Sequence, residues 1–511
     1  MIQTQPSRQF QKRLLIRADA SPEIGAGHIM RCLALAQAWQ DAGGCCTFVL
    51  ASHAPALEER LKAEGLEVLH LANRPGSRDD AAQTAALARQ VGAAWVVVDG
   101  YPFGDDYQHA LKAAGLRVLF VDDYGHAGYY AADLVLNQNL SADEKLYRRR
   151  EPYTQLLLGT RYALLRREFW PWHGWQREIA KVGNKVLVTL GGADSQNATL
   201  KVIQALQQVV LDGLEAVVVV GGMNPHLTEL RSAIQQSKRN IRLESNVPHM
   251  PDWIAWADIA IAAGGSTCWE LAFMGLPALI LVLADNQQSV ATALEAAGAA
   301  VNLGRHTALA PADIAQAVSR LAAAQDTRAA IAQRAQELVD GSGAFRIVSQ
   351  MSGNRLLLRP VQAHDCRLVW EWANDPLTRA FSFSLQPIPW ERHLEWFTAK
   401  LSDPLTLFCI AINADGVPIG QIRYQIEGTE AVVSVSVAPN QRGKGYGREI
   451  ICLGAQRVFA STPVELIHAY VKPDNVASLR AFAAAGFVNG GLIEIKGNQA
   501  VHWTLRKDAQ P

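Results

Sequence analysis

The first third of the chain alternates short apolar runs with helical patterns. Runs rich in β-branched residues and without polar alternation are typical of parallel strands buried on both faces. Such runs occupy Leu14–Ala18, Cys46–Leu50, Trp95–Asp99, Arg117–Asp122 and Leu134–Asn137. The helical stretches between them make βαβ units, so we predict an α/β fold with a doubly wound sheet.

The same pattern starts again after residue 175. Its apolar runs occupy Lys185–Leu190, Ala216–Val220, Ile241–Leu243, Asp258–Ala262 and Ala278–Leu283. The Trp- and Arg-rich stretch Arg161–Glu178 is interpreted as the connection between the two parts. We therefore expect two Rossmann-like halves, residues 1–175 and 176–347. Ligands of such sheets bind in the cleft between the carboxyl ends of the strands.

A third pattern begins after the segment DGSGAFRIVSQMSGNR, in which residues 348–354 are interpreted as a linker. A strand at Leu356–Arg359 is followed by Trp-rich helical segments. Alternating strands then follow at Phe408–Ile412, Ile419–Tyr424 and Ala431–Ala438, before a helix and a final αβ unit. These elements predict a mixed α+β domain over residues 355–511.

Composition narrows the class of protein. The chain has 511 residues, of which 49% are hydrophobic and 19% charged, as in an ordinary globular protein. Lys and Arg together number 48, as do Asp and Glu, so no excess charge indicates nucleic acid or an anionic membrane as partner. No apolar run reaches the roughly 18 residues that span a bilayer. The seven cysteines lack CxxC spacing and no secretory signal precedes them, which predicts reduced thiols in a cytoplasmic protein.

A glycine loop, EIGAGH, follows the first predicted strand and opens a helix; it contains Gly25, Gly27 and His28. Glycines let the backbone come close to a ligand, and a helix N-terminus favours negative charge. The dinucleotide fingerprint G-x-G-x-x-G is absent. His28 has two interpretations from its position. It is either a helix-start residue bonded to backbone, or a general base, a role that suits an imidazole with an ordinary pKa of about 6.5.

Two further glycine loops follow strands of the second half. In AAGGSTCWELAFMGLP, backbone amides and hydroxyls at a helix start can form a diphosphate cradle, and Glu270 one turn later can accept hydrogen bonds from a ribose diol. Alternatively, Ser266 is a helix N-cap and Glu270 a partner of the helix dipole. The loop VTLGGADSQNAT can close over the same ligand. The candidate UDP-sugar contacts are Gly25, Gly27, Gly191, Gly192, Gly264, Gly265, Ser266, Thr267 and Glu270.

These motifs resemble known families. The GGS-x-x-x-E pattern is similar to the nucleotide-binding half of GT-B enzymes, in particular the UDP-GlcNAc transferase of peptidoglycan synthesis. RADASPEIGAGHIMRCLALA, VVVDGY, LGTRYALLRREF and DGSGAFR resemble the UDP-sugar hydrolases of the pseudaminic acid pathway, over residues 13–347. The resemblance implies inverting, metal-independent hydrolysis of UDP-2,4-diacetamido-2,4,6-trideoxy-β-L-altropyranose, with His28 as the general base. Asp19, Asp99 and Tyr101 follow or end strands at the same cleft and can orient sugar or water; loop capping explains Asp19 equally well.

The most specific motif is QRGKGYG, which lies between an alternating strand and the apolar helix Ile450–Phe459. It matches the Q/R-x-x-G-x-G/A motif of GNAT-family acetyltransferases. The resemblance implies that loop amides bind the pyrophosphate of acetyl-CoA at the helix N-terminus. A plain glycine-rich hairpin would leave the helix unexplained. The expected acetyl-CoA contacts are Val437, Gln441, Arg442, Gly443, Lys444, Gly445, Gly447, Asn475 and Ser478.

The segment NVASLRAFAAAGF also matches the GNAT pattern but has Phe482 where the family frequently has Tyr. Phenylalanine has no proton for the departing CoA thiolate, which leaves Tyr470, Tyr446, His468 or a water for that role. The segments WEWANDPLTRAFSFS and PWERHLEWFTAKL resemble the aminosugar acetyltransferase of the same pathway, although most of their Trp residues fit an amphipathic core.

Together these features predict a bifunctional enzyme. It would N-acetylate a UDP-4-amino-sugar with acetyl-CoA as cosubstrate and then hydrolyse the UDP-linked diacetamido sugar, without a metal. Two alternatives remain open: a GT-B glycosyltransferase with an acceptor in place of water, and a UDP-sugar-binding half that regulates an acetyltransferase. The sequence also leaves open a sugar of the legionaminic type.

Overall fold

The computed structural model describes residues 12–21, 24–192, 194–222, 224–245, 247–495 and 497–509. The chain divides into two compact units. One consists of Lys12–Gln40 and Gly44–Ile347, and the other consists mainly of the residues from Val348 onward. None of the described helices is both long and apolar enough to cross a membrane. All seven cysteines are free thiols.

The first half of the larger unit is built on a parallel seven-stranded sheet in the order β3-β2-β1-β4-β5-β6-β7. Its strands are β1 (Arg13–Ala18), β2 (Cys45–Leu50), β3 (Glu67–His70), β4 (Ala93–Asp99), β5 (Val118–Val121), β6 (Leu134–Asn137) and β7 (Gln155–Leu158). Its helices are α1 (Gly27–Asp41), α2 (Pro55–Ala63), α3 (Arg78–Gln90) and α4 (Asp105–Ala113). The five predicted strands are confirmed. The two edge strands, β3 and β7, were not predicted, because exposed polar residues at their ends leave only short, partly exposed apolar runs.

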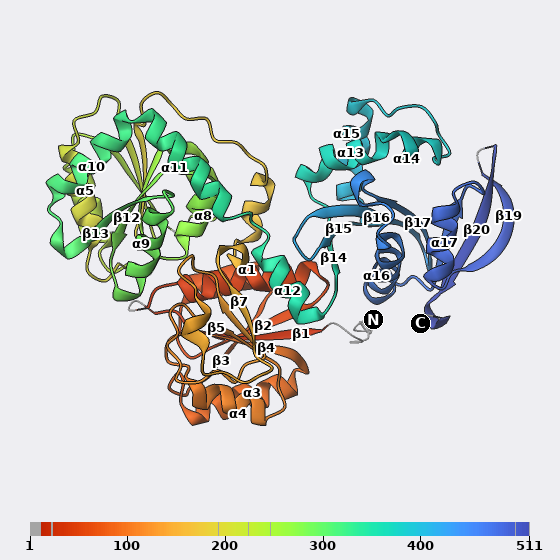
Figure 1. Cartoon of the computed structure of the whole chain (residues 1–511), viewed down its shortest axis with the longest axis horizontal. Coiled ribbons are helices and arrows are strands. Elements are labelled where there is room, and N and C mark those ends of the chain that lie inside the picture. Colours follow the sequence, from red (N-terminus) through yellow and green to blue (C-terminus); the bar gives the residue numbers. More distant parts are fainter. Residues whose placement is uncertain are drawn as a thin grey trace, which may run out of the picture. The chain divides into compact units, whose positions relative to one another are not determined.

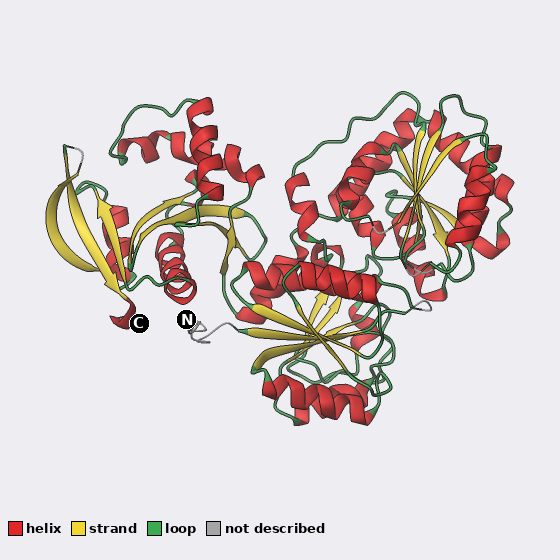
Figure 2. Ribbon diagram, turned by 180° about the vertical axis from the view of Figure 1, so that it is seen from behind, coloured by secondary structure: helices red, strands yellow, loops and turns green. Residues whose placement is uncertain are grey.

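The second half has a parallel six-stranded sheet in the order β10-β9-β8-β11-β12-β13. Its strands are β8 (Lys185–Thr189), β9 (Glu215–Val220), β10 (Asn240–Ser245), β11 (Ile259–Ala263), β12 (Ala278–Val282) and β13 (Val301–Arg305). Its helices are α5 (Ala198–Gln208), α6 (Leu227–Gln235), α7 (Met250–Trp256), α8 (Thr267–Phe273), α9 (Gln288–Ala296), α10 (Pro311–Ala323) and α11 (Gln325–Leu338). Helices cover both faces of each sheet (Figure 2), as the doubly wound prediction requires.

The segment expected to be a linker is largely helical. Helix α12 spans Gly343–Ser352, so residues 348–352 continue a helix of the preceding segment, and only residues 353–355 lie between it and β14. The cause is a buried stripe at helical spacing, formed by Ala344, Phe345, Ile347, Val348 and Met351. The prediction of a linker over residues 348–354 is corrected accordingly.

The smaller unit is a mixed α+β domain around the sheet β14-β15-β16-β17-β18-β20-β19, in which only β17 and β18 are parallel. Its strands are β14 (Leu356–Pro360), β15 (Thr406–Asn413), β16 (Pro418–Glu427), β17 (Glu430–Val437), β18 (Leu466–Val471), β19 (Val488–Ile495) and β20 (Asn498–Arg506). Its helices are α13 (Cys366–Asn374), α14 (Pro376–Ala380), α15 (Trp390–Ser402), α16 (Tyr446–Ser461) and α17 (Val476–Ala484). Helix α16 lies on one face of the sheet, and α13, α14 and α15 lie on the other (Figure 1).

Candidate active sites

Glycines bring the three predicted loops of the larger unit together. A β-carbon at Gly27 would lie 3.9 Å from Oγ of Ser266, and one at Gly192 would lie 3.2 Å from the backbone of Ala26. Gly25 and Gly191 have positive φ angles of 75° and 97°, which turn the backbone as L side chains rarely allow. The loops after β1, β8 and β11 therefore meet where the carboxyl ends of both sheets face one another.

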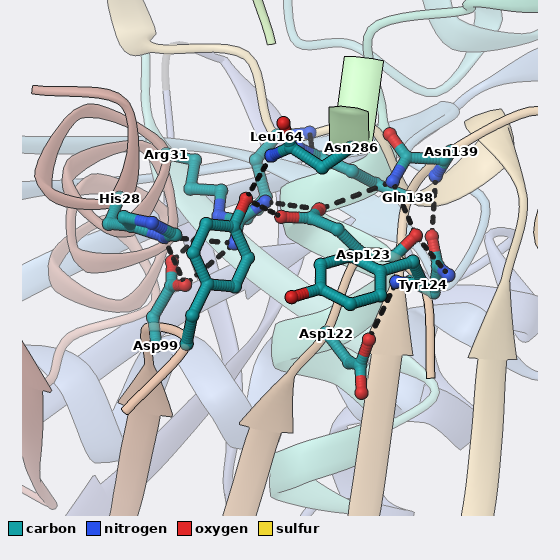
Figure 3. A network of polar contacts seen from close by, with 12 residues as sticks. His28, Arg31, Asp99, Asp122, Asp123, Tyr124, Gln138, Asn139, Leu164 and Asn286 are labelled. Atoms are coloured by element: carbon teal, nitrogen blue, oxygen red, sulfur yellow. Dashed lines mark hydrogen bonds and ion pairs between the residues drawn. The ribbon is translucent and has the colours of Figure 1, made fainter. Parts of the chain in front are cut away.

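His28 lies at the second position of α1, and a buried carboxylate holds its ring. Nδ1 of His28 is 2.7 Å from Oδ1 of Asp99 at the end of β4. Arg31, one turn further along α1, donates to both oxygens of Asp99, over 2.7 Å and 2.6 Å (Figure 3). Burial opposes ionisation, but Arg31 and His28 hold the pKa of Asp99 well below its usual range. Asp99 is therefore an anion that orients the imidazole.

The contacts of His28 also determine which ring nitrogen carries the proton. Arg31 Nη2 lies 3.1 Å from Nδ1, but the carboxylate of Asp99 is closer and can only accept, so the proton is assigned to Nδ1. Nε2 then has the free lone pair, and it makes no hydrogen bond with any residue that the structure describes. The side chain is 7% exposed. An imidazole held by a carboxylate in this way has the geometry of a general base.

Tyr101 lies beside this pair and connects it to the second half. Its ring meets the His28 imidazole edge-on, with ring centroids 4.9 Å apart. Its hydroxyl donates to Asp123 over 3.0 Å and accepts from the amide of Asn286 over 2.7 Å. Arg31 also donates to Asp123, over 2.6 Å. Burial and Asp123 raise the pKa of Tyr101, so its hydroxyl stays protonated.

Asp19 is engaged elsewhere. One carboxylate oxygen accepts from the amides of Ala51, over 2.6 Å, and Ser52, over 3.3 Å, while the other accepts from Arg17 over 2.7 Å. These contacts match the loop-capping interpretation: Asp19 fixes the loop after β2 to the end of β1. Among the described residues, no hydrogen bond joins Asp19 to His28 or Asp99. A direct catalytic role for Asp19 remains a prediction.

Glu270 lies in the first turn of α8 with its side chain 13% exposed. Its carboxylate is 3.0 Å from Arg166, which is equally close to Glu168. Burial, with Glu168 nearby, raises the pKa of Glu270 to about 7 in spite of Arg166. A ribose diol would therefore have to share this carboxylate with an arginine that the sequence interpretation did not include.

The GGS loop before α8 has the free donors that an anion site requires. Gly264 packs closely, since a β-carbon there would lie 2.9 Å from the carbonyl oxygen of Gln287, whereas Gly265 faces open space. Ser266 occupies the N-cap position of α8, but its side chain makes no capping hydrogen bond. The amides of Ser266 and Thr267 have no backbone partner among the described residues.

In the smaller unit, the glycine loop after β17 has a similar character. Gly443 and Gly445 have φ angles of 78° and 83°, and Gly445 is the N-cap of α16. Their amides make no backbone hydrogen bond with a described residue. The side chain of Arg442 is held by Asp375, over 2.6 Å, and by Thr378. The loop is thus shaped by its own residues and by the start of α14, with its amides left free.

The remaining predicted acetyl-CoA contacts surround this loop or lie at α17. Val437 is the last residue of β17, and Lys444 donates to Gln441 over 2.9 Å. A β-carbon at Gly447 would lie 3.6 Å from the β-carbon of Ala481 in α17. Asn475 caps α17 by accepting from the amide of Ser478 over 3.1 Å, which is a structural role that leaves ligand contact a prediction.

Strands β17 and β18 separate next to the glycine loop. They pair only where Glu430–Val432 lies opposite Leu466–His468. Beyond that point β17 continues beside β16, and β18 continues beside β20. From Val433 onward, no described strand pairs with the edge of β17 that faces away from β16, and an extended ligand that contains amides can pair with such an edge.

Two family matches correspond to these two sites. Residues 355–488 match the acetyltransferase (GNAT) domain, and residues 186–344 match the glycosyltransferase family 28 C-terminal domain. The chain is a fusion of a GT-B-like unit and a GNAT acetyltransferase domain. The predicted fold class is thereby confirmed.

Relatives of the fusion protein differ in how much of it they share. An uncharacterized protein of Methanocaldococcus jannaschii is 21% identical over 93% of this chain and 96% of its own length. The UDP-2,4-diacetamido-2,4,6-trideoxy-β-L-altropyranose hydrolase of Campylobacter jejuni is 24% identical over 56% of this chain and 97% of its own length. The L-2,4-diaminobutyric acid acetyltransferase of Nocardia farcinica is 31% identical over 27% of this chain and 66% of its own length.

Among the side chains predicted as proton donors in the GNAT domain of the fusion protein, His468 contacts two other titratable side chains. His468 lies at the point where β17 and β18 separate; its Nε2 is 3.0 Å from Glu430, and its Nδ1 is 2.9 Å from Nε2 of His502. Tyr470 stacks on His502, with ring centroids 5.1 Å apart. Tyr446 lies instead in the first turn of α16, against Arg355. Phe482 is buried in the core of the domain.

Sequence reasoning missed the groups that hold the candidate residues. Arg31, Asp123, Asn286 and Arg166 were not predicted, although each contacts a predicted residue or its partner. A signal existed for two of them. Arg31 is one helical turn after His28, and Asp123 is the second residue after the buried strand β5, at the ligand-binding edge of the sheet.

Proposed function

We propose that the fusion protein acts twice on one UDP-linked sugar. The GNAT domain N-acetylates a UDP-4-amino-sugar, and the GT-B-like unit hydrolyses the product, UDP-2,4-diacetamido-2,4,6-trideoxy-β-L-altropyranose, to UDP and the free sugar. The observation that carries the hydrolase assignment is the free Nε2 of His28, oriented by Asp99 where glycine loops of both halves meet. The C. jejuni hydrolase, matched over 97% of its length, supports the substrate.

In the proposed hydrolysis, a water oxygen attacks the anomeric carbon opposite the UDP group, and the bond from that carbon to the β-phosphate oxygen breaks with inversion. His28 Nε2 accepts a proton from the water, and Asp99 balances the charge that develops on the ring. The free amides of Ser266 and Thr267 stabilise the departing diphosphate. UDP leaves as an anion, so the proposal requires neither a general acid nor a metal.

In the proposed acetyl transfer, acetyl-CoA places its pyrophosphate on the loop amides of Gly443 and Gly445 and extends along the free edge of β17. The thioester then reaches the point where β17 and β18 separate, beside His468. The sugar amine forms a bond to the carbonyl carbon and the carbon–sulfur bond breaks; the nitrogen loses one proton to give the amide, and the thiolate accepts one to give the free thiol of CoA. His468, paired with Glu430 and His502, is the group that we assign to proton transfer there.

A single experiment tests the proposal. The full-length protein is incubated with the UDP-4-amino-sugar, and UDP and N-acetyl signals are followed by NMR with and without acetyl-CoA. We expect N-acetylation only with acetyl-CoA, and UDP release only after N-acetylation. Release of UDP from the diacetamido substrate without any acceptor identifies hydrolysis.

A second candidate follows from the glycosyltransferase family 28 match over residues 186–344. In that case an acceptor hydroxyl takes the place of water at His28, and UDP release depends on the added acceptor. Binding of one UDP-sugar per chain without turnover would favour instead a regulatory half attached to an acetyltransferase.

A further inference from the structure

Three metal-ligating side chains converge at the carboxyl edge of the first sheet, separately from His28. His53 lies in the loop after β2, Glu58 in α2 and His70 at the end of β3. Their ligand atoms lie within 4.8 Å of one another, and the described residues contain no other such group of three. One oxygen of Glu58, Oε2, is 3.3 Å from Nε2 of His70, and the other, Oε1, is 4.0 Å from Nδ1 of His53.

The backbone around this group is already fixed. Pairing of β2 with β3 places His70 opposite Leu50. The loop that leads to His53 is anchored by Asp19, which accepts from the amides of Ala51 and Ser52. Oε1 of Glu58 accepts a hydrogen bond from the amide of Ala54 over 3.2 Å. Carboxylates that bind metals are commonly oriented by such an additional hydrogen bond.

Structural roles do not account for the whole arrangement. Helix capping explains the contact of Glu58 with Ala54, but not the two imidazoles beside the same carboxylate. The rings of His53 and His70 are stacked with centroids 4.5 Å apart, and His53 is 80% exposed, so burial does not hold it there. Glu58 and His70 are the only partners of His53 among the described residues. The ring nitrogens of both imidazoles and the carboxylate between them are close enough to share one cation.

We propose that His53, Glu58 and His70 bind one divalent zinc ion. Two imidazole nitrogens and one carboxylate oxygen, with water in the fourth position, are a ligand set that Zn²⁺ takes, and the absence of a thiolate from the set excludes a closed cysteine site. Lys62, whose Nζ is 3.8 Å from Glu58, is 61% exposed and free to move away from the cation.

The proposed site is distinct from the proposed hydrolytic centre. In the sheet order β3-β2-β1, two strand spacings, about 10 Å, separate β3 from the strand that leads to His28. No hydrogen bond or ion pair that the structure describes joins the three ligands to Asp99 or Asp123. Zinc would therefore fasten the loop before α2 to the edge strand and increase the stability of this half, without taking part in UDP release.

Isothermal titration calorimetry of the untagged, chelator-treated full-length protein with ZnCl₂ tests the proposal. We expect one zinc ion per chain with micromolar affinity, and a rise in melting temperature on addition of zinc. His53→Ala and His70→Ala should each weaken binding at least about ten-fold. Glu58→Gln, which keeps an acceptor for the Ala54 amide, should do the same without disturbing α2. His109→Ala removes an exposed histidine elsewhere in this half and should leave affinity unchanged.

Circular dichroism without metal shows whether each variant is folded. Equal zinc affinity in the wild type and in folded His70→Ala and Glu58→Gln variants would overturn the proposal, as would an absence of binding to the wild type. UDP release is measured separately, in the presence of EDTA, so that the two proposals can fail independently. A protein that releases UDP but binds no zinc contradicts only the zinc proposal. A protein that binds zinc but releases no UDP contradicts only the hydrolase proposal.

Discussion

The 2.7 Å contact between Nδ1 of His28 and Oδ1 of Asp99 joins the start of α1 to the end of β4, 71 residues further along the chain. The contact gives the helix-start histidine a defined ring orientation, because the carboxylate fixes the proton on Nδ1 and leaves the lone pair on Nε2. The residue begins a helix, as one interpretation from the sequence had it, but its ring is bound by a side chain and not by the backbone; the role of general base stays a prediction.

His28→Asn should lower the rate of UDP release on the order of 100-fold or more, since it removes the proton acceptor. UDP binding, measured by calorimetry, should change little, because the diphosphate is expected on the loops of the second half. His109→Asn, a matched change at an exposed position, should have no effect. Hydrolysis at the wild-type rate in His28→Asn would remove this residue from the mechanism.

Asp99→Asn should reduce kcat strongly while leaving the KM for the UDP-sugar nearly unchanged. The substitution removes the anion that orients His28, and it deprives buried Arg31 of one of its two carboxylates. A lower melting temperature should accompany the loss of rate, because an ion pair buried at this depth has lost a partner. The exposed Asp252 offers a control: Asp252→Asn should alter neither quantity. An unchanged kcat in Asp99→Asn would contradict the base assignment.

The raised pKa of Glu270 predicts that the affinity for UDP depends on pH. Its pKa is raised to about 7, so at pH 6 the group is mainly protonated and at pH 8 mainly ionised. The ionised form accepts hydrogen bonds from a ribose diol, and affinity for UDP should therefore rise by up to about ten-fold between pH 6 and pH 8. Calorimetry at pH 6 and at pH 8 measures this change in affinity. In Glu270→Gln the ionisation is absent, and the difference between the wild-type and variant profiles isolates Glu270 from ionisation of UDP itself. Identical profiles would mean that Glu270 only pairs with Arg166.

His468, Tyr446 and Tyr470 are the three side chains that the sequence offers as proton donors in acetyl transfer, and they have different surroundings in the structure. His468→Gln should lower the rate of acetyl transfer at least about ten-fold with the KM for acetyl-CoA unchanged, because His468 lies where β17 and β18 separate and is linked to Glu430. Tyr446→Phe and Tyr470→Phe are the comparison variants and should retain more activity. If Tyr470→Phe is the slowest of the three, the thiolate receives its proton from Tyr470 instead.

How far the sequence could predict the fold is clear from its strands. Fully buried strands such as β4 and β11 appear as continuous apolar runs, and all ten predicted strands of the two parallel sheets are present. Three of the four edge strands of these sheets, β3, β7 and β13, were missed because one side of each is open to water, whereas the edge strand β10 was predicted. In β3, for example, Glu67 and His70 are exposed. Helix α12 was read as a linker because its glycines and serines outweighed its buried stripe.

The candidate sites show a different limit. Motifs located the glycine loops and His28, because these residues stand together between the end of a strand and the start of a helix. The residues that contact these side chains are distant in sequence. Arg166 is 3.0 Å from Glu270, and Asn286 donates a hydrogen bond to Tyr101 from the other half. Such pairs depend on tertiary packing, which a single sequence with no aligned relatives does not reveal.

The two activities should be separable. Since α12 ends at Ser352, division between Gly353 and Asn354 leaves every helix and strand intact and gives each fragment its own sheet and core. The fragment from Asn354 should acetylate the UDP-4-amino-sugar, and Gly445→Asp should stop it. At a φ of 83°, this position is strained for any side chain, and a carboxylate would face the pyrophosphate.

The fragment that ends at Gly353 should hydrolyse the diacetamido UDP-sugar without acetyl-CoA, and EDTA should not inhibit it. Each fragment is assayed alone against its own substrate and again in an equimolar mixture. Because each proposed site is built entirely from residues of one fragment, mixing should not raise either rate per molecule. Hydrolysis that appears only in the mixture would mean that the two parts form a composite active site, and the separate-enzyme proposal would be abandoned.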